Sequence, residues 1–396
     1  MQKRYLLTPG PTQVPPEVLL RMSQPMVHHR SPEFSQLFAE VQAGLQRLFQ
    51  TDQDVLILAA SGTGAMEAAV FNTCSAGESV LVVNGGKFGQ RWLEICRAAG
   101  LTAVEIRVEW GQAVAVETVA RALEQHPEVR AVLVQASETS TTVLHPVQDL
   151  ARLTCHTDRL LIVDAITALG ATAIPMDSWG IDILVSGSQK ALMLPPGLAF
   201  VALSARAWQR AAAASLPRFY FDLRRERQAQ YKHTTAYTPA VSLITGLHEV
   251  LRLLQDEGLP QVYARHAHLA RATRAAAQAL GLRLLAPEHP SPAATGVWLP
   301  PEVDGGQLLN AMRTHMGVDI AGGQDQLSGK IVRISHIGYA GPFDVMTAIS
   351  ALEMALVAFG CDIELGRGVR AAQEVLLTGW PELKPVSDTG SAGTGR

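Results

Sequence analysis

Short apolar runs alternate with helix-length segments from about residue 50 to residue 205, and no other feature of the sequence constrains the fold as strongly. The runs are rich in Val, Ile and Leu, which is typical of strands buried on both faces. They predict seven strands, at Val55–Ala59, Ser79–Val83, Ala103–Val108, Ala131–Gln135, Leu160–Val163, Ile181–Val185 and Ala199–Leu203. Helices are predicted between them at Thr63–Cys74, Phe88–Ala99, Val116–Gln125 and Val147–His156. This alternation indicates an α/β fold with a mostly parallel, seven-stranded sheet between helices.

The rest of the chain predicts a second, smaller α/β domain. Residues 205–240 show little regular pattern, and helices are expected over residues 241–257 and 261–280. Further on, short strands at 296–299 and 330–335 alternate with helices at 306–316 and 343–359. We therefore predict a large domain over 16–258 and a small domain made of 1–15 and 259–379. Residues 380–396 are small and polar, and we expect a disordered tail there.

Composition narrows the class of protein. A hydrophobic content of 47% excludes a disordered chain, and a formal net charge of −3 indicates no nucleic-acid-binding surface. Apolar runs are too short for a membrane span, and the opening MQKRYLLTPGPT is too short in apolar residues for a secretory signal. The four cysteines form no CxxC pair, which favours free thiols over a zinc site or disulfides. We expect a cytoplasmic protein with no metal, nucleic-acid or membrane partner.

Only six lysines occur in the chain, and imine chemistry needs one of them because an arginine stays protonated. Lys190 is the one that follows a buried strand and precedes an apolar stretch, Ala191–Leu194. Apolar surroundings disfavour the charged form of a lysine and make it a usable nucleophile. The alternative is a surface lysine at the end of a strand.

Two other segments follow predicted strands. Ser61–Ala69 (SGTGAMEAA) opens a helix, where glycines and free amides favour a phosphate, although an ordinary capped turn has the same composition. Asp164 ends the apolar run Leu160–Val163, and a buried carboxylate needs a partner such as a metal, a histidine or a protonated ring nitrogen, unless it caps a helix. Ligands of such sheets bind at the carboxyl ends of the strands. A phosphate cradle, a carboxylate and a lysine at one edge meet the three needs of pyridoxal 5′-phosphate (PLP).

The sequence resembles the class V aminotransferases of the alanine–glyoxylate and serine–glyoxylate (serine–pyruvate) type, which have the PLP-dependent transferase fold type I. The matching strings cover nearly the whole chain in order: LLTPGPTQVP, SGTGAMEAA, NGGKFGQRW, ETSTTVLHP, VDAITALGA, DILVSGSQKALMLPPG, YTPAVSLITGL and VRISHIG. The pairing of VDA with SGSQK at this spacing is specific to the family.

The resemblance implies a role for each matching residue. Lys190 would form the imine with PLP and move the substrate proton, while Asp164 would pair with the pyridine nitrogen. Arg333 would bind the substrate α-carboxylate in a pocket that the Gly10 backbone also lines. Around the cofactor it implies a phosphate cradle of Thr63, Gly64 and Ala65 with Gln189 beside it, Phe88 and Ile166 on the two ring faces, Thr139 near the phenolic oxygen, and Tyr231, Thr235 and Thr238 from the neighbouring subunit of a homodimer.

The implied reaction is ping-pong transfer of an amino group from alanine or serine to glyoxylate or pyruvate. An aspartate- or phosphoserine-type class V aminotransferase is the alternative, and Arg218, Arg224, Arg225 and Arg227 could then bind the second acidic group or form a solvated basic face. A cysteine desulfurase-like lyase is disfavoured because Gln189, in place of the usual His, precedes Lys190. A nicotinamide-dependent dehydrogenase is opposed by the missing GxGxxG, and a non-catalytic relative by the presence of Lys190 and Asp164.

Overall fold

A seven-stranded sheet organises the larger part of the protein. The computed structural model describes residues 3–379, and its main sheet has the strand order β2-β10-β9-β8-β5-β3-β4. All strands run parallel except β10, which is antiparallel to both of its neighbours. The strands are β2 (Val55–Leu58), β3 (Ser79–Asn84), β4 (Thr102–Arg107), β5 (Val129–Gln135), β8 (Leu160–Asp164), β9 (Ile183–Gly187) and β10 (Ala199–Leu203). The predicted α/β fold with a mostly parallel, seven-stranded sheet is confirmed.

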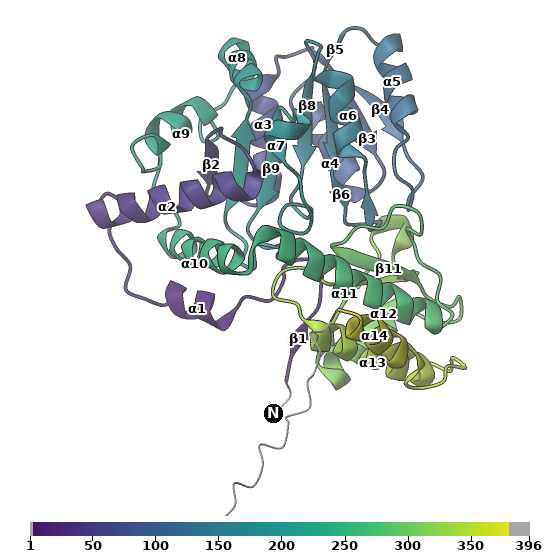
Figure 1. Ribbon diagram of the computed structural model, residues 1–396. Coiled ribbons are helices and arrows are strands. Elements are labelled where there is room, and N and C mark those ends of the chain that lie inside the picture. Colours follow the sequence, from purple (N-terminus) through teal and green to yellow (C-terminus); the bar gives the residue numbers. More distant parts are fainter. Residues whose placement is uncertain (1–2, 380–396) are drawn as a thin grey trace, which may run out of the picture.

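Two apolar clusters cover the two faces of this sheet, because successive side chains of a strand point to opposite faces. Leu133 of β5 belongs to one cluster, whereas Val132 and Val134 belong to the other. The first face packs on α3 (Gly62–Thr73), α4 (Lys87–Ala98), α8 (Ala205–Ala213) and α9 (Leu223–Gln230). The second packs on α1 (Pro16–Met22), α2 (Pro32–Phe49), α5 (Val116–Gln125), α6 (Val147–Thr154), α7 (Met176–Trp179) and α10 (Val241–Glu257). The helices therefore form a layer on each side of the sheet (Figure 1).

The C-terminal part lies below the main sheet in Figure 1, and a third apolar cluster forms its core. Its three-stranded antiparallel sheet has the order β11-β14-β13, and the N-terminal β1 pairs in parallel with β12. Its elements are β1 (Tyr5–Leu6), α11 (Leu259–Ala279), β11 (Ala294–Trp298), α12 (Gly305–Ala311), β12 (Val318–Asp319), β13 (Ala321–Gly322), β14 (Ile331–Ser335), α13 (Pro342–Ala358) and α14 (Arg367–Leu377). The exact division at residues 15 and 258 stays a prediction, and the expected tail at 380–396 lies outside the described residues.

Two stretches differ from the expectation from sequence. Residues 205–240 contain α8 and α9, each started by a single capping side chain, Ser204 and Asp222, which accept hydrogen bonds from backbone amides of the first turn. These helices have only 9 and 8 residues, so few positions in the sequence mark them. The helix expected over 306–316 ends its α-helical part at Ala311 and continues as a π-helical turn, Met312–Met316.

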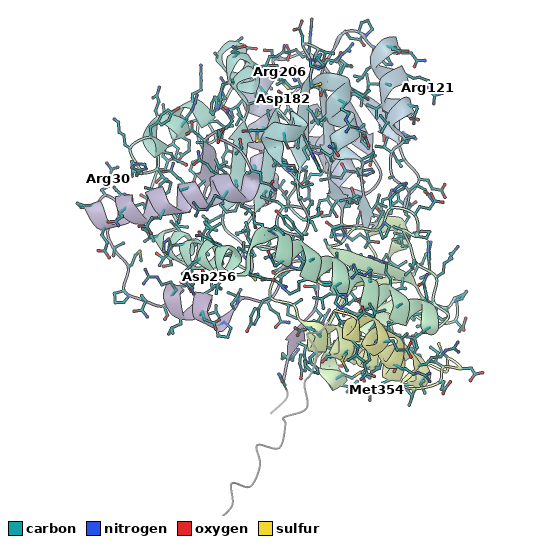
Figure 2. All side chains as sticks on the ribbon, in the orientation of Figure 1. Arg30, Arg121, Asp182, Arg206, Asp256 and Met354 are labelled. Atoms are coloured by element: carbon teal, nitrogen blue, oxygen red, sulfur yellow. The ribbon has the colours of Figure 1, made fainter. Side chains whose placement is uncertain are left out.

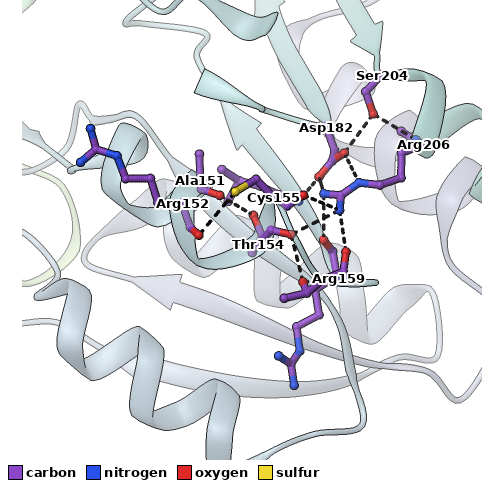
Figure 3. Close-up of polar contacts among 11 residues, drawn as sticks. Ala151, Arg152, Thr154, Cys155, Arg159, Asp182, Ser204 and Arg206 are labelled. Atoms are coloured by element: carbon purple, nitrogen blue, oxygen red, sulfur yellow. Dashed lines mark hydrogen bonds and ion pairs between the residues drawn. The ribbon is translucent and has the colours of Figure 1, made fainter. Parts of the chain in front are cut away.

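A polar network fixes the edge of the sheet where β8 and β9 begin. The buried carboxylate of Asp182 accepts hydrogen bonds from the Leu161 amide at 2.8 Å, from Ser204 Oγ at 2.9 Å and from Arg206 Nε at 2.9 Å. Figure 3 shows the Arg206 guanidinium between this carboxylate and the backbone carbonyl of Arg159. Figure 2 places Asp182 and Arg206 at the end of the sheet far from the C-terminal part. This network therefore stabilises the fold at the edge opposite Lys190, which follows β9.

None of the helices between residues 3 and 379 combines the length and the hydropathy that a membrane crossing needs.

Candidate active site

Asp164 and Lys190 follow neighbouring strands, so the fold brings them to one edge of the sheet. Asp164 lies opposite Val185 in the β8–β9 register, and its carboxylate accepts a hydrogen bond from the Ile166 amide at 2.8 Å. Burial is the main cause that raises the pKa of Asp164 to about 7. Burial, followed by the charge of Arg333, lowers the pKa of Lys190 to about 8. Both groups thus titrate near neutral pH, as acid–base residues of active sites do.

The N-terminal segment lies against Lys190. The Lys190 ammonium donates a hydrogen bond to the carbonyl oxygen of Pro9 at 3.1 Å. Thr12 Oγ1 donates to the carbonyl oxygen of Lys190 at 2.8 Å, and the Thr12 amide donates to the carbonyl oxygen of Gln189 at 3.1 Å. Gly10 has a φ of +153°, and any side chain there would collide with the Lys190 side chain. Gly10 therefore lies beside the Lys190 side chain.

The start of α3 forms a glycine-lined recess beside these residues. Ser61 precedes the helix without a side-chain cap, so its first amides are not capped by that hydroxyl. A Cβ added to Gly62 would lie 2.5 Å from Ile166 Cδ1, which packs closely on this turn. Gln189 Oε1 is buried here and has no hydrogen-bond partner among the described residues. Thr63 Oγ1 accepts from Arg91 Nη1 at 3.1 Å. Backbone amides at a helix start suit a phosphate, and the Gln189 side chain could add a donor only through its NH₂ group.

The other two members of the predicted cradle contribute no polar side chain. Gly64 follows Thr63 in the first turn of α3, where an added Cβ would approach Ala60 and Phe221. The Ala65 methyl is fully buried in the apolar cluster under this face of the sheet. These two residues therefore offer an anion no more than backbone amides, and the Gly64 amide already donates to the Ser61 carbonyl oxygen at 2.8 Å.

An aromatic side chain and an arginine stand at the start of α4. Phe88 lies in the first turn of this helix, and the Arg91 guanidinium lies over its ring at 4.9 Å from the ring centre. Arg91 thus joins the Phe88 ring to Thr63 at the start of α3. A stacked cation restricts the ring of Phe88.

Arg333 reaches the site from β14. Its Nη1 donates to the carbonyl oxygen of Thr139 at 2.7 Å, and its Nε donates to that of Gly322 at 2.9 Å. Thr139 Oγ1 donates to Thr167 Oγ1 at 2.7 Å, which orients the Thr139 side chain. Burial lowers the pKa of Arg333 to about 10. No ion pair within residues 3–379 involves Arg333, so its charge is met by neutral carbonyls. A buried guanidinium in this state is prepared for a carboxylate ligand.

Tyr231, Thr235 and Thr238 are placed differently from the other expected site residues. Tyr231 is exposed at the end of α9, and Thr235 and Thr238 line a cavity with Phe221 and Tyr237. Within the described chain, no hydrogen bond links these three residues to Lys190 or Asp164. The structure of a single chain therefore does not bring them to the lysine.

Three buried or half-buried polar residues of the site are absent from the predictions made from sequence. They are Arg91, Gln135 and Glu138. Gln135 lies opposite Asp164 in the β5–β8 register, and both atoms of its side-chain amide are buried without a partner in the described chain. A polar residue ending the apolar strand β5 is a signal that could have identified Gln135. Arg91 lies three residues after Phe88, which is one helical turn.

Comparisons with known proteins show which family and which solved structures the chain resembles. A family model described as aminotransferase class V matches residues 4–338. A protein named soluble hydrogenase, small subunit, from a Synechococcus species is 46% identical over 95% of this chain and 99% of its own. The L-aspartate–glyoxylate aminotransferase of Paracoccus denitrificans is 35% identical, with 93% and 95% covered. The serine–glyoxylate aminotransferase of Methylorubrum extorquens is 33% identical, with 94% and 96% covered.

Among solved structures, the ureidoglycine–glyoxylate aminotransferase of Bacillus subtilis superposes with a TM-score of 0.91. It is 30% identical, and the match covers 95% of this chain and 99% of that one.

Proposed function

Since the chain belongs to the class V aminotransferases, a family of PLP-dependent enzymes, we propose that it transfers the amino group of alanine or serine to glyoxylate or pyruvate in a ping-pong reaction. The observation that carries this proposal is the meeting of Lys190, Asp164 and Arg333 at one edge of the sheet. Lys190 and Asp164 come from adjacent strand ends, and the charge of Arg333 acts on Lys190.

The residues at this edge fit PLP. The start of α3 suits its phosphate, to which the Gln189 side-chain NH₂ could donate, and Phe88 and Ile166 can flank a planar ring. Asp164 has a carboxylate oxygen that takes no part in its hydrogen bond to Ile166 and can pair with a protonated ring nitrogen. When bound, PLP supplies an electron sink for negative charge at the substrate Cα.

The chain's own residues would supply the rest of the chemistry. A lysine with a pKa of about 8 is partly uncharged at mildly alkaline pH, so the Lys190 amine can take the Cα proton and return it. Arg333 would orient the substrate by a bidentate contact with its carboxylate, because its two carbonyl partners fix the plane of the guanidinium.

Several basic side chains considered for a second acidic group are already engaged, which supports a small donor, whereas Arg91 beside Phe88 forms no ion pair within residues 3–379. Lys87, next to Phe88, is already paired with Asp325 at 3.0 Å, so a second substrate carboxylate would have to compete for this cation. Arg227 is paired with Asp54 at 2.8 Å, just before β2 and so at the edge opposite Lys190, and Arg218 donates to backbone carbonyls such as that of Phe71 near the end of α3. Aspartate as the donor is the second candidate, because the Paracoccus relative carries that activity in its name.

Some relatives carry a hydrogenase name. No group of three or more His, Cys, Asp or Glu side chains within residues 3–379 is arranged to hold a metal ion. The match to the class V aminotransferase model over residues 4–338 supports the aminotransferase function. The cytoplasmic location expected from the sequence stays a prediction.

The first prediction tests the proposed reaction. Purified protein incubated with PLP is expected to gain a visible absorption band that borohydride reduction removes. Alanine, serine, aspartate and phosphoserine are then assayed as donors, each with glyoxylate, pyruvate and 2-oxoglutarate. We expect the highest kcat/KM for alanine or serine with glyoxylate or pyruvate. A higher value with aspartate or phosphoserine would establish the second candidate, and sulfide release from cysteine without transamination would point to a lyase.

We also propose a homodimer in which Tyr231, Thr235 and Thr238 complete the partner's phosphate site. Phe219, Tyr220 and Tyr231 are large and exposed, and Tyr220 stacks on Tyr237 at 5.0 Å. Exposed aromatic clusters of this kind are typical of protein interfaces. The same loop carries the two threonines, so a partner that covers the aromatic side chains would also receive them.

Subunit mixing provides the second prediction. Lys190→Ala and a Thr235→Ala/Thr238→Ala double variant are unfolded together, refolded and assayed. If the threonines act across the interface, each mixed dimer contains one intact site, and activity recovers to about a quarter of the wild-type value. Activity no greater than that of the separate variants would show that the threonines do not act in trans.

A further inference from the structure

We propose that Glu138 is a positioning residue that holds the aromatic side chain of the cofactor site and the arginine of the substrate site in one rigid unit. The inference rests on the proposed function, because it assigns Phe88 and Arg333 to cofactor and substrate. It adds a role for a residue that contacts neither ligand in that assignment.

The carboxylate of Glu138 closes the start of α4. Glu138 is fully buried, and its Oε2 accepts hydrogen bonds from the backbone amides of Phe88 at 3.1 Å and Gly89 at 3.0 Å. Its Oε1 accepts from the Ser140 amide at 3.3 Å and from the Ser140 hydroxyl. The Lys87 amide donates to Ser140 Oγ at 2.9 Å. Three consecutive amides of the first turn of α4 are thus held by two side chains of another segment.

Close packing makes this contact rigid. A Cβ added to Gly86, the residue before α4, would lie 2.7 Å from Glu138 Cγ and would also collide with Ser140. The loop before α4 therefore touches Glu138 through a bare backbone. A shift of Glu138 would move Phe88, because the contacts leave no free space on this side.

The peptide that carries Glu138 also holds Arg333. The next residue, Thr139, offers its carbonyl oxygen to Arg333 Nη1 at 2.7 Å. Residues 138–140 thus contact both the helix that bears Phe88 and the guanidinium from β14. One displacement of this peptide would disturb the two halves of the site together.

Charge gives Glu138 a second effect on the site. Burial raises the pKa of Glu138, whereas the hydrogen bonds from Ser140, Gly89 and Phe88 act in the opposite direction. These four hydrogen bonds stabilise the ionised form, but burial is the larger effect and the pKa of Glu138 is raised overall. When ionised, Glu138 partly offsets the effect of burial on the pKa of Arg333. Arg333 thereby gains a nearby opposite charge without an ion pair that a substrate carboxylate would have to break.

The chain contains a matched control for a purely structural role. Glu353 is also buried, and its carboxylate accepts from the amides of Gly366 at 3.0 Å, Gly368 at 2.6 Å and Val369 at 3.1 Å, at the start of α14. It holds a helix start as Glu138 does, but in the C-terminal cluster. Replacing either glutamate by glutamine substitutes an NH₂ donor for one acceptor oxygen and leaves amides of the helix start unpaired.

The experiment compares Glu138→Gln with Glu353→Gln in the full chain. Both variants are expected to unfold at a lower temperature without PLP, since each loses part of a buried helix cap. Only Glu138→Gln is expected to raise the dissociation constant of PLP, by about tenfold, and to change the visible circular dichroism of the bound cofactor. If Glu138→Gln does not fold, Ser140→Ala serves instead, because it removes the hydroxyl that joins Glu138 to the Lys87 amide.

Equal PLP affinity and equal dichroism in the two glutamate variants would overturn the inference and leave Glu138 as an ordinary helix cap. The same result with Ser140→Ala, where that variant replaces Glu138→Gln, would overturn it too. Failure of the wild-type chain to bind PLP is a separate outcome, because it removes the proposed function and this inference with it.

Discussion

Lys190→Ala is expected to lower kcat for transamination by at least ~10³-fold, since proton transfer by a positioned amine contributes rate factors of that order. The amine is nearly buried and donates a hydrogen bond to the Pro9 carbonyl oxygen, while Thr12 holds the Lys190 backbone carbonyl oxygen. The measurement is kcat for the best donor–acceptor pair. Intact mass after borohydride reduction supplies a second readout. The wild-type chain should retain the cofactor covalently, whereas the variant should release it on denaturation.

Lys87→Ala is the matched control for the lysine experiment. Lys87 also lies near the site, beside Phe88, but its ammonium is half-exposed and pairs with Asp325. Losing such an ion pair costs about 1 kcal/mol or less. We expect the covalent label to persist in this variant and kcat to change by about tenfold or less. Covalent labelling that survives in Lys190→Ala, or wild-type turnover in that variant, would show that another residue performs the chemistry.

The main sheet could be predicted from the sequence because its strands are nearly all apolar. A run such as Leu160–Val163 contains no polar side chain, which is typical of a strand buried on both faces. The charged Asp164 marks where the run ends. The same contrast between an apolar run and one charged residue identified Lys190 after β9. Parallel strands place their ends at one edge, so these two residues could be brought together before the structure was known.

Glu138 and Gln135 could not be assigned in the same way. Glu138 contacts the start of α4, which lies about fifty residues earlier in the chain, so no local pattern records the contact. Gln135 belongs to the candidate site only because the β5–β8 register places it opposite Asp164, and the sequence does not give that register. Arg333 was identified through a family motif, and its carbonyl partners on Thr139 and Gly322 became visible only in the folded chain. Such contacts depend on tertiary packing.

Asp164→Asn is expected to stabilise the protein without PLP and to weaken PLP binding. An aspartate in an unfolded chain has a pKa of about 3.9, whereas burial raises that of Asp164 to about 7. Between these values the folded chain binds more protons than the unfolded chain, so this group lowers the free energy of unfolding as the pH rises from about 4 to about 7. At pH 8 the loss amounts to about 4 kcal/mol as an upper bound. An asparagine does not ionise, so the variant avoids this loss of stability.

With PLP bound, Asp164→Asn should destabilise the protein, whereas without PLP it should stabilise it. A protonated ring nitrogen supplies a direct ion-pair partner, which the buried Asp164 carboxylate lacks within residues 3–379 although the charges of Arg91 and Lys190 act on it. An asparagine cannot form the same charge-assisted hydrogen bond, so the dissociation constant of the variant for PLP should rise by on the order of tenfold or more. Thermal unfolding at pH 4 and pH 8, without and with PLP, measures both effects. Asp182→Asn is the control, because its carboxylate pairs with Arg206 at the opposite edge of the sheet and its loss should destabilise the chain with or without PLP. If Asp164→Asn lowers the unfolding temperature without PLP at pH 8, the carboxylate supports the fold, and its assignment as a strained partner awaiting a positive charge is wrong.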